Sequence, residues 1–213
     1  MACFITFEGI EGCGKTTQLQ RLANRLEAGG LPVLRTREPG GCPIADQIRS
    51  ILLNADNSAM QPMTELLLYA GARAQHVAEV VRPALAAGKT VLCDRFTDAT
   101  VAYQGFARGL NGDIIEQLNR MATGNLSPDL TLLLDCPVEV GLGRATARIN
   151  ATRGEKEERF ERESLQFHEK VRSGYLELAR REPQRFIVID GSQGPDATEH
   201  LVANAVLARL TAG

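Results

Sequence analysis

The chain has 213 residues, enough for one domain with a buried core, and its 44% hydrophobic and 23% charged residues are ordinary for a globular protein. The formal net charge of -2 argues against a general nucleic-acid-binding protein, and no apolar stretch approaches the roughly 18–20 residues that span a membrane. The five cysteines form no C-x-x-C pair, which argues against a zinc site. Scattered cysteines and the lack of a secretory leader predict a cytoplasmic protein.

Short apolar runs alternate along the chain with longer segments of helical periodicity. The predicted strands are residues 3–8, 32–36, 90–94, 130–136 and 186–190. The predicted helices are residues 15–28, 45–53, 62–87 (one long helix or a kinked pair) and 199–210. This alternation is typical of an α/β fold with a five-stranded parallel sheet and helices on both faces. Residues 144–163 are crowded with charge and carry little core material, so we expect a mobile insertion there.

A glycine-rich segment follows the first predicted strand and opens the first predicted helix. It matches G-x-x-x-x-G-K-[ST] in full and in the expected context, which predicts a P-loop. Its backbone N–H groups would surround phosphate oxygens, Lys15 would neutralise the β- and γ-phosphates, and the Thr16 hydroxyl would bind Mg²⁺. The residues predicted to bind the ATP phosphates are Gly9, Ile10, Glu11, Gly12, Cys13, Gly14, Lys15, Thr16 and Thr17.

A P-loop alone does not distinguish an ATPase, a GTPase and a kinase. The N-K-x-D motif that usually binds guanine is absent from the sequence. The third predicted strand ends in Asp94 and Arg95, at the carboxyl edge of the sheet where such sites form. We expect Asp94 to hold Mg²⁺ through water and Arg95 to reach a phosphate. Asp135, which ends the fourth predicted strand, is interpreted as mainly structural.

Several further stretches, in the same order along the chain, resemble those of bacterial thymidylate kinases. They are Thr36-Arg37-Glu38-Pro39-Gly40-Gly41, Leu67-Leu68-Tyr69-Ala70-Gly71-Ala72-Arg73, Asp94-Arg95-Phe96, Ala102-Tyr103-Gln104-Gly105 and Ser127-Pro128-Asp129-Leu130-Thr131. The resemblance spans nearly the whole chain. It implies a nucleoside monophosphate kinase-like P-loop fold, a single domain over residues 1–213, and a mobile lid at about 144–159.

The same resemblance implies transfer of the ATP γ-phosphate to dTMP, giving dTDP for dTTP synthesis, with Mg²⁺ and in a homodimer. Neither a nucleic acid nor a membrane is expected as a partner. Another nucleotide or nucleoside kinase on the same scaffold is the alternative enzyme. A nucleotide-binding switch without transfer activity is the alternative from another class.

By resemblance, most of the acceptor site can be assigned by residue. Arg49 and Arg95 would grip the dTMP phosphate, and Tyr69 would stack on thymine. Arg73 would donate to thymine O4, which favours a carbonyl over the amino group of cytosine. Glu11 would face the sugar 3′-hydroxyl or the lid arginines. The remaining residues expected to bind dTMP are Glu38, Thr100, Tyr103 beside the 2′ position, and Gln104 at N3 and O4.

The P-loop itself carries no arginine, so the resemblance places the catalytic cations in a lid. Arg144 and Arg148 are spaced to share one helix face. Arg148 and Arg153 are the first catalytic candidates, followed by Arg159; the alternative is a solvated face with weak ion pairs. No general base is needed, because a phosphate monoester is mostly dianionic near neutral pH. The three histidines are therefore not expected to be catalytic, and His76 is expected to lie at the surface or cap a helix.

Overall fold

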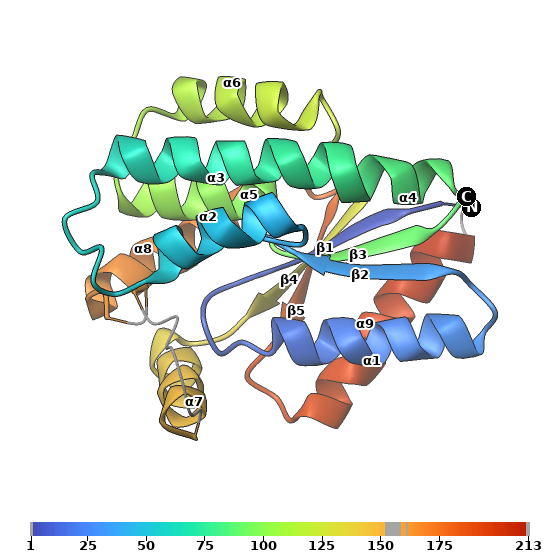
Figure 1. The fold of residues 1–213 in the computed structure, drawn as a ribbon. Coiled ribbons are helices and arrows are strands. Elements are labelled where there is room, and N and C mark those ends of the chain that lie inside the picture. Colours follow the sequence, from blue (N-terminus) through green and yellow to red (C-terminus); the bar gives the residue numbers. More distant parts are fainter. Residues whose placement is uncertain (1, 152–158, 161, 212–213) are drawn as a thin grey trace.

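A computed structural model describes residues 2–151, 159–160 and 162–211, which form a layered α/β fold (Figure 1). Five parallel strands make one sheet in the order β2-β3-β1-β4-β5. All five predicted strands are present, with ends within one residue of the prediction. They are β1 (Phe4–Glu8), β2 (Val33–Arg37), β3 (Thr90–Asp94), β4 (Leu130–Asp135) and β5 (Phe186–Asp190).

The central position of β1 brings the predicted site to the middle of the sheet. β1 pairs with β3 on one side and with β4 on the other. Phe4, Ile5 and Phe7 are buried, as expected for a strand with both faces covered. The loop after β1 therefore lies between the carboxyl ends of β3 and β4, where parallel sheets form ligand sites.

Helices cover both faces of this sheet (Figure 1). On one face α1 packs against β1, β2 and β3, and α9 packs against β5. On the other, α4 packs on β3 and α8 on β4 and β5, while α2 and α6 lie against α3. The helices are α1 (Lys15–Ala28), α2 (Pro43–Leu53), α3 (Pro62–His76), α4 (Arg82–Ala86), α5 (Thr97–Thr100), α6 (Gly112–Thr123), α7 (Val138–Ala151), α8 (Leu165–Arg181) and α9 (Pro195–Thr211).

The predicted long helix at 62–87 is interrupted by a π-helical turn. The segment η1 (Val77–Val81) joins α3 to α4. Pro83 lies in the first turn of α4 and has no N–H to donate, which accounts for a change in hydrogen-bond pattern at this point. A second π-helical segment, η2 (Val101–Ala107), continues α5. The sequence patterns predicted no helix at α5, η2 or α6, because these segments mix polar and apolar residues on their buried faces.

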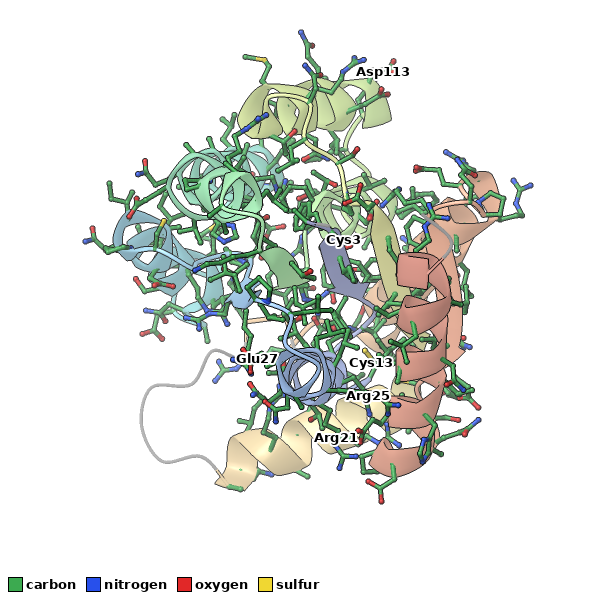
Figure 2. All side chains as sticks on the ribbon, turned by 90° about the vertical axis from the view of Figure 1, so that its right-hand side faces the viewer. Cys3, Cys13, Arg21, Arg25, Glu27 and Asp113 are labelled. Carbon is green, nitrogen blue, oxygen red and sulfur yellow. The ribbon has the colours of Figure 1, made fainter. Side chains whose placement is uncertain are left out.

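The main core lies between the sheet and the helices on both its faces. All five cysteines are free and buried. Figure 2, which looks almost along α1, labels the exposed Arg25 and Glu27 of that helix and the buried Cys13 of the loop before it. Within the described residues, no helix combines the length and the apolar character needed to cross a membrane.

Candidate active site

The P-loop follows β1 and ends at α1. Gly12 has a φ of 69°, in the left-handed region that favours glycine. A Cβ added at Gly12 would lie only 1.9 Å from the carbonyl oxygen of Gly141 in α7. The loop backbone thus packs directly against the α7 backbone. No side chain, and therefore no arginine, fits at position 12.

Lys15 is folded back over this loop. Its Nζ donates to the carbonyl oxygens of Gly9 at 3.0 Å and Ile10 at 2.7 Å, and it lies 3.5 Å from Sγ of Cys13. The ammonium group is thereby held against the backbone of the loop to which the P-loop motif assigns phosphate binding. Cys13 is only 1% exposed, so its thiol is covered in this conformation.

Thr16 and Asp94 meet beside the loop. The Thr16 hydroxyl donates to Oδ2 of Asp94 at 2.6 Å. Among the described residues, no group of three or more His, Cys, Asp or Glu side chains could hold a metal by itself. A hydroxyl with a single carboxylate nevertheless fits Mg²⁺, which usually binds one or two carboxylates together with substrate phosphates and water.

A cleft of about 320 Å³ extends from the P-loop toward α7 and α9. Arg148 and Arg144 both line this cleft. Arg144 also donates hydrogen bonds to the carbonyl oxygens of Gly191 at 2.7 Å and Ser192 at 2.8 Å, which hold the segment after β5 against α7. The two arginines lie on one helix, as their spacing predicts, whereas Arg153 lies outside the described residues. The cleft wall between β5 and α9 was not predicted from the sequence, although Gly191 directly after a strand was an available signal. The wall residues that line the cleft are Gly191, Gln193, Pro195 and Thr198.

Arg95 lies directly after β3 with a left-handed φ of 70°. A non-glycine residue in this region is strained, and such strain gathers at functional sites. The guanidinium donates to the Gly9 carbonyl oxygen and to the Tyr175 hydroxyl, each at 3.0 Å, and to Oε1 of Glu11 at 3.0 Å. It also lies 4.9 Å from the centre of the Tyr103 ring. Arg95 thus joins the P-loop to the predicted acceptor site.

Glu11 points from the P-loop toward these side chains. Its Oε1 also accepts a hydrogen bond of 2.5 Å from the Tyr103 hydroxyl, and its Oε2 lies 3.2 Å from Nδ1 of His168. Burial acts to raise the pKa of the Glu11 carboxyl, but the positive charge of Arg95 leads the interactions that hold this pKa well below its usual range. Glu11 is therefore a buried carboxylate that stays ionised.

Arg73 is 98% buried and donates four of its five N–H groups within the protein. Nε donates to Oε2 of Glu38, and Nη2 to the Thr100 hydroxyl and the Phe96 carbonyl oxygen. Nη1 donates once, to Oδ1 of Asn119, and keeps one N–H for a ligand. The side chain is held rigidly, as a residue that reads a base requires.

Glu38 contacts Arg73 with one carboxylate oxygen and His76 with the other. The second Glu38 oxygen, Oε1, lies 2.9 Å from Nδ1 of His76, whose Nε2 lies 2.6 Å from the Thr36 hydroxyl. Both carboxylate oxygens of Glu38 are therefore engaged within the protein, which suits it to orienting Arg73. The expectation of a surface position for His76 is wrong, because this side chain is fully buried.

Gln104 is oriented by Glu65, a residue that sequence analysis missed. Nε2 of Gln104 donates to Oε1 of Glu65 at 2.7 Å, and both side chains are 1% exposed. Oε2 of Glu65 pairs with Nη1 of Arg159 at 2.7 Å, and Nε of Arg159 donates to the Leu52 carbonyl oxygen. Arg159 therefore lies beside the acceptor residues and does not line the cleft at the P-loop.

Phe160 lies among the aromatic residues assigned to the acceptor. Its ring centre is 6.5 Å from that of Tyr69 and 5.3 Å from that of Tyr103.

Arg49, on α2, donates to the Pro39 carbonyl oxygen at 2.9 Å. Asp135 accepts two hydrogen bonds from Arg172 of α8, at 2.7 and 2.9 Å, in agreement with a structural role.

Comparison with known proteins identifies a single family. The sequence model described as Thymidylate kinase matches residues 7–202. A thymidylate kinase of Geotalea uraniireducens (strain Rf4) is 67% identical over 213 residues, which cover 100% of both chains. One of Citrifermentans bemidjiense is 67% identical over 210 residues, covering 99% of this chain and 93% of the relative. One of Geobacter sulfurreducens is 65% identical over 210 residues, covering 99% of each.

Proposed function

The chain belongs to the thymidylate kinase family, and from that premise we propose that it is a dTMP kinase whose P-loop holds ATP and whose acceptor site holds dTMP. The reaction transfers the γ-phosphate of ATP to dTMP and gives dTDP and ADP. The fold is the P-loop nucleoside monophosphate kinase fold. The observation that carries the assignment is the bridge made by Arg95, which contacts the P-loop at Gly9 and the acceptor side at Glu11.

On the donor side, the residues from Gly9 to Thr17 bind the ATP phosphates. Lys15 moves from the carbonyl oxygens that it now contacts to the β- and γ-phosphate oxygens, which are stronger acceptors because they are charged. Arg148 faces the same cleft and adds a second cation. Arg153 is proposed from the sequence as a further lid cation. Together they neutralise charge that develops on the transferring phosphoryl group.

Thr16 and Asp94 would hold Mg²⁺, Thr16 directly and Asp94 through water. Mg²⁺ held there would supply positive charge that offsets the charge of the ATP phosphates. The residues fit this role because both present oxygen and already lie 2.6 Å apart. Their hydrogen bond also aligns the start of α1 with the end of β3 before any ligand enters.

On the acceptor side, each part of dTMP meets a different group. Arg49 and Arg95 take the phosphate, since planar guanidinium groups bind phosphate through paired hydrogen bonds. Tyr69 stacks on thymine, and the free N–H of Arg73 donates to O4. Because Nε2 of Gln104 faces Glu65, its Oε1 is left as an acceptor for N3–H of thymine.

The acceptor needs no base, because its phosphate supplies the nucleophilic oxygen already deprotonated. The work of the protein is alignment of the two phosphates and neutralisation of charge. The Arg95 guanidinium donates to Oε1 of Glu11 at 3.0 Å, and it can exchange this carboxylate oxygen for an oxygen of the dTMP phosphate. Tyr103 then keeps Glu11 in place through its own hydrogen bond while it restricts space near the sugar.

The reaction is tested with purified protein, Mg-ATP and a panel of acceptors. We expect dTDP from dTMP, and at least about tenfold lower kcat/KM with dCMP and dAMP, whose bases present an amino group to Arg73. The panel also includes dUMP and thymidine. Turnover of another acceptor without turnover of dTMP would contradict the assignment. Equal rates with dTMP and dCMP would contradict the role of Arg73 while leaving the reaction in place.

We also propose a homodimer formed through α2, α3 and α6. Each of these helices carries two exposed apolar side chains at helical spacing, and α3 packs against both other helices. The residues are Ile44, Ile51, Met63, Leu67, Ile114 and Met121. Leu67→Glu is expected to shift the mass measured by light scattering from dimer to monomer. Leu201→Glu, on α9, is the matched control and should leave the mass unchanged. A monomer in the parent chain contradicts the proposal.

We place the enzyme in the cytoplasm. The five free cysteines support this proposal, because a reducing compartment keeps thiols unpaired. Fractionation of the native cells, with the activity assayed in each fraction, tests it.

A further inference from the structure

We propose that His168 is a positioning residue of the acceptor site, which holds the Glu11 carboxylate in the orientation that receives the 3′-hydroxyl of dTMP. This inference rests on the proposed function and on the position at the sugar 3′-hydroxyl that the family resemblance implies for Glu11, and it extends that role to a second residue. His168 is fully buried and lies in the first turn of α8, far in sequence from the P-loop.

The two Glu11 oxygens have different surroundings. Oε1 accepts hydrogen bonds from Arg95 and Tyr103. Oε2 lies 3.2 Å from Nδ1 of His168, within ion-pair range, yet the contact is not aligned as a hydrogen bond. Tyr103 keeps Oε1 engaged when Arg95 turns to the dTMP phosphate, so the oxygen that remains for a ligand is Oε2, and His168 is the side chain next to it.

Polar atoms at this point are buried without hydrogen bonds. Within the described part of the chain, neither Oε2 of Glu11 nor either ring nitrogen of His168 has a hydrogen-bond partner. Leaving such atoms unsatisfied in the protein interior is unfavourable. The 3.2 Å contact with Nδ1 of His168 holds Oε2 beside the imidazole, and Oε2 keeps the capacity to accept a hydrogen bond from a ligand. A ligand hydroxyl that donates to Oε2 satisfies that oxygen, while His168 stays beside Oε2 and fixes its orientation.

The surroundings keep the imidazole in place. Ser164 caps α8 by accepting from the Phe167 N–H at 3.2 Å. The Phe167 ring meets the His168 ring edge-on at 5.6 Å and the Tyr103 ring at 6.1 Å. The start of α8 thus fixes His168 in position against Glu11. Its role is to orient Glu11, since the 3′-hydroxyl does not react and no proton leaves it.

The test compares dTMP with its 3′-deoxy analogue, 2′,3′-dideoxythymidine 5′-monophosphate, as acceptors for the full-length chain. In His168→Phe, kcat/KM for dTMP should fall about tenfold or more, while kcat/KM for the 3′-deoxy acceptor changes less than about twofold. The ratio of the two values within one preparation does not depend on the fraction of folded protein. A structural role alone would lower both values together.

Three further variants complete the design. His168→Asn keeps an amide near the position of Nδ1 and should restore most of the dTMP preference. His200→Asn, an exposed histidine on α9, should behave as the parent. Glu11→Gln should lose the preference as His168→Phe does. If Glu11→Gln loses it and His168→Phe does not, the inference about His168 is wrong. If Glu11→Gln instead lowers kcat/KM for both acceptors equally, the role of Glu11 at the 3′-hydroxyl and the inference about His168 are both wrong, while turnover of dTMP by the parent chain still supports the proposed function.

Discussion

The hydroxyl of Thr16 donates a 2.6 Å hydrogen bond to the carboxylate of Asp94, so the end of the P-loop and the end of β3 meet at one pair of oxygen atoms. The same two residues are proposed to hold Mg²⁺, Thr16 directly and Asp94 through water. The proposed metal site therefore depends on both residues, and a substitution of either Thr16 or Asp94 should affect it.

Asp94→Asn should raise the Mg²⁺ concentration for half-maximal rate by about tenfold or more and lower kcat, because the amide has lost the charge that attracts the ion. The rate is measured against Mg²⁺ at fixed ATP. Thr16→Ser keeps the hydroxyl and should remain within about fivefold of the parent. Unchanged Mg²⁺ dependence in Asp94→Asn would place the metal elsewhere.

Arg73→Ala should lower the free energy of unfolding by about 3–5 kcal/mol, because Glu38 is left buried without its guanidinium partner. The value is measured by urea denaturation. Arg37→Ala is the control. This substitution removes the exposed ion pair between Arg37 and Asp46, and it should lower the free energy of unfolding by less than about 1 kcal/mol. Losses of equal size in the two variants would show that the buried contacts of Arg73 contribute little.

Glu8 should make stability fall as the pH rises. Burial, with the neighbouring charge of Asp98, raises the pKa of the Glu8 carboxyl from 4.5 to about 8. Between these values the folded state holds a proton that the unfolded state has lost, so the free energy of unfolding decreases with pH. Glu8→Gln cannot lose this proton, and its Tm relative to the parent should increase across the same window.

Calorimetry at several pH values within that window measures the difference in Tm. Glu177→Gln serves as the control. Hydrogen bonds from Arg180 and Arg181 lower the pKa of Glu177 to about 2, so its charge does not change in the window. If the difference in Tm between Glu8→Gln and the parent stays constant across this pH window, Glu8 titrates outside the window.

Arg159→Ala should raise KM for dTMP severalfold and change KM for ATP less than about twofold, because Arg159 pairs with Glu65 beside Gln104. Steady-state rates are measured with each substrate varied in turn. Arg148→Ala, in the ATP cleft, should show the opposite pattern. A selective effect of Arg159→Ala on KM for ATP would support the lid role expected from the sequence.

The strands and the P-loop were predictable because their signals are local. A short apolar run and a glycine-rich turn do not depend on distant contacts, and all five strands were found. The placement of Arg159 was not predictable. Its motif shows where it lies along the chain, but not whether its side chain enters the donor cleft or pairs with Glu65.

The supporting residues of the site were missed for a similar reason. His168 and Glu11 are 157 positions apart, and no periodicity links them. Glu65 has the appearance of a solvated residue in a helical pattern, yet it is buried and contacts Gln104, Arg108 and Arg159. A charged residue that is buried only because it meets other charges cannot be identified from one sequence.

The contact between Gly12 and Gly141 gives α7 a fixed point of support at the phosphate-binding loop. With no side chain between the two backbones, this contact is a natural pivot for a rotation of α7. Arg148 lies about 10 Å farther along the axis at a rise of about 1.5 Å per residue. A rotation of about 20° therefore displaces it by roughly 3.5 Å, which is comparable to the length of a hydrogen bond. In this geometry a small change of helix angle is enough to engage or withdraw a cation from ATP.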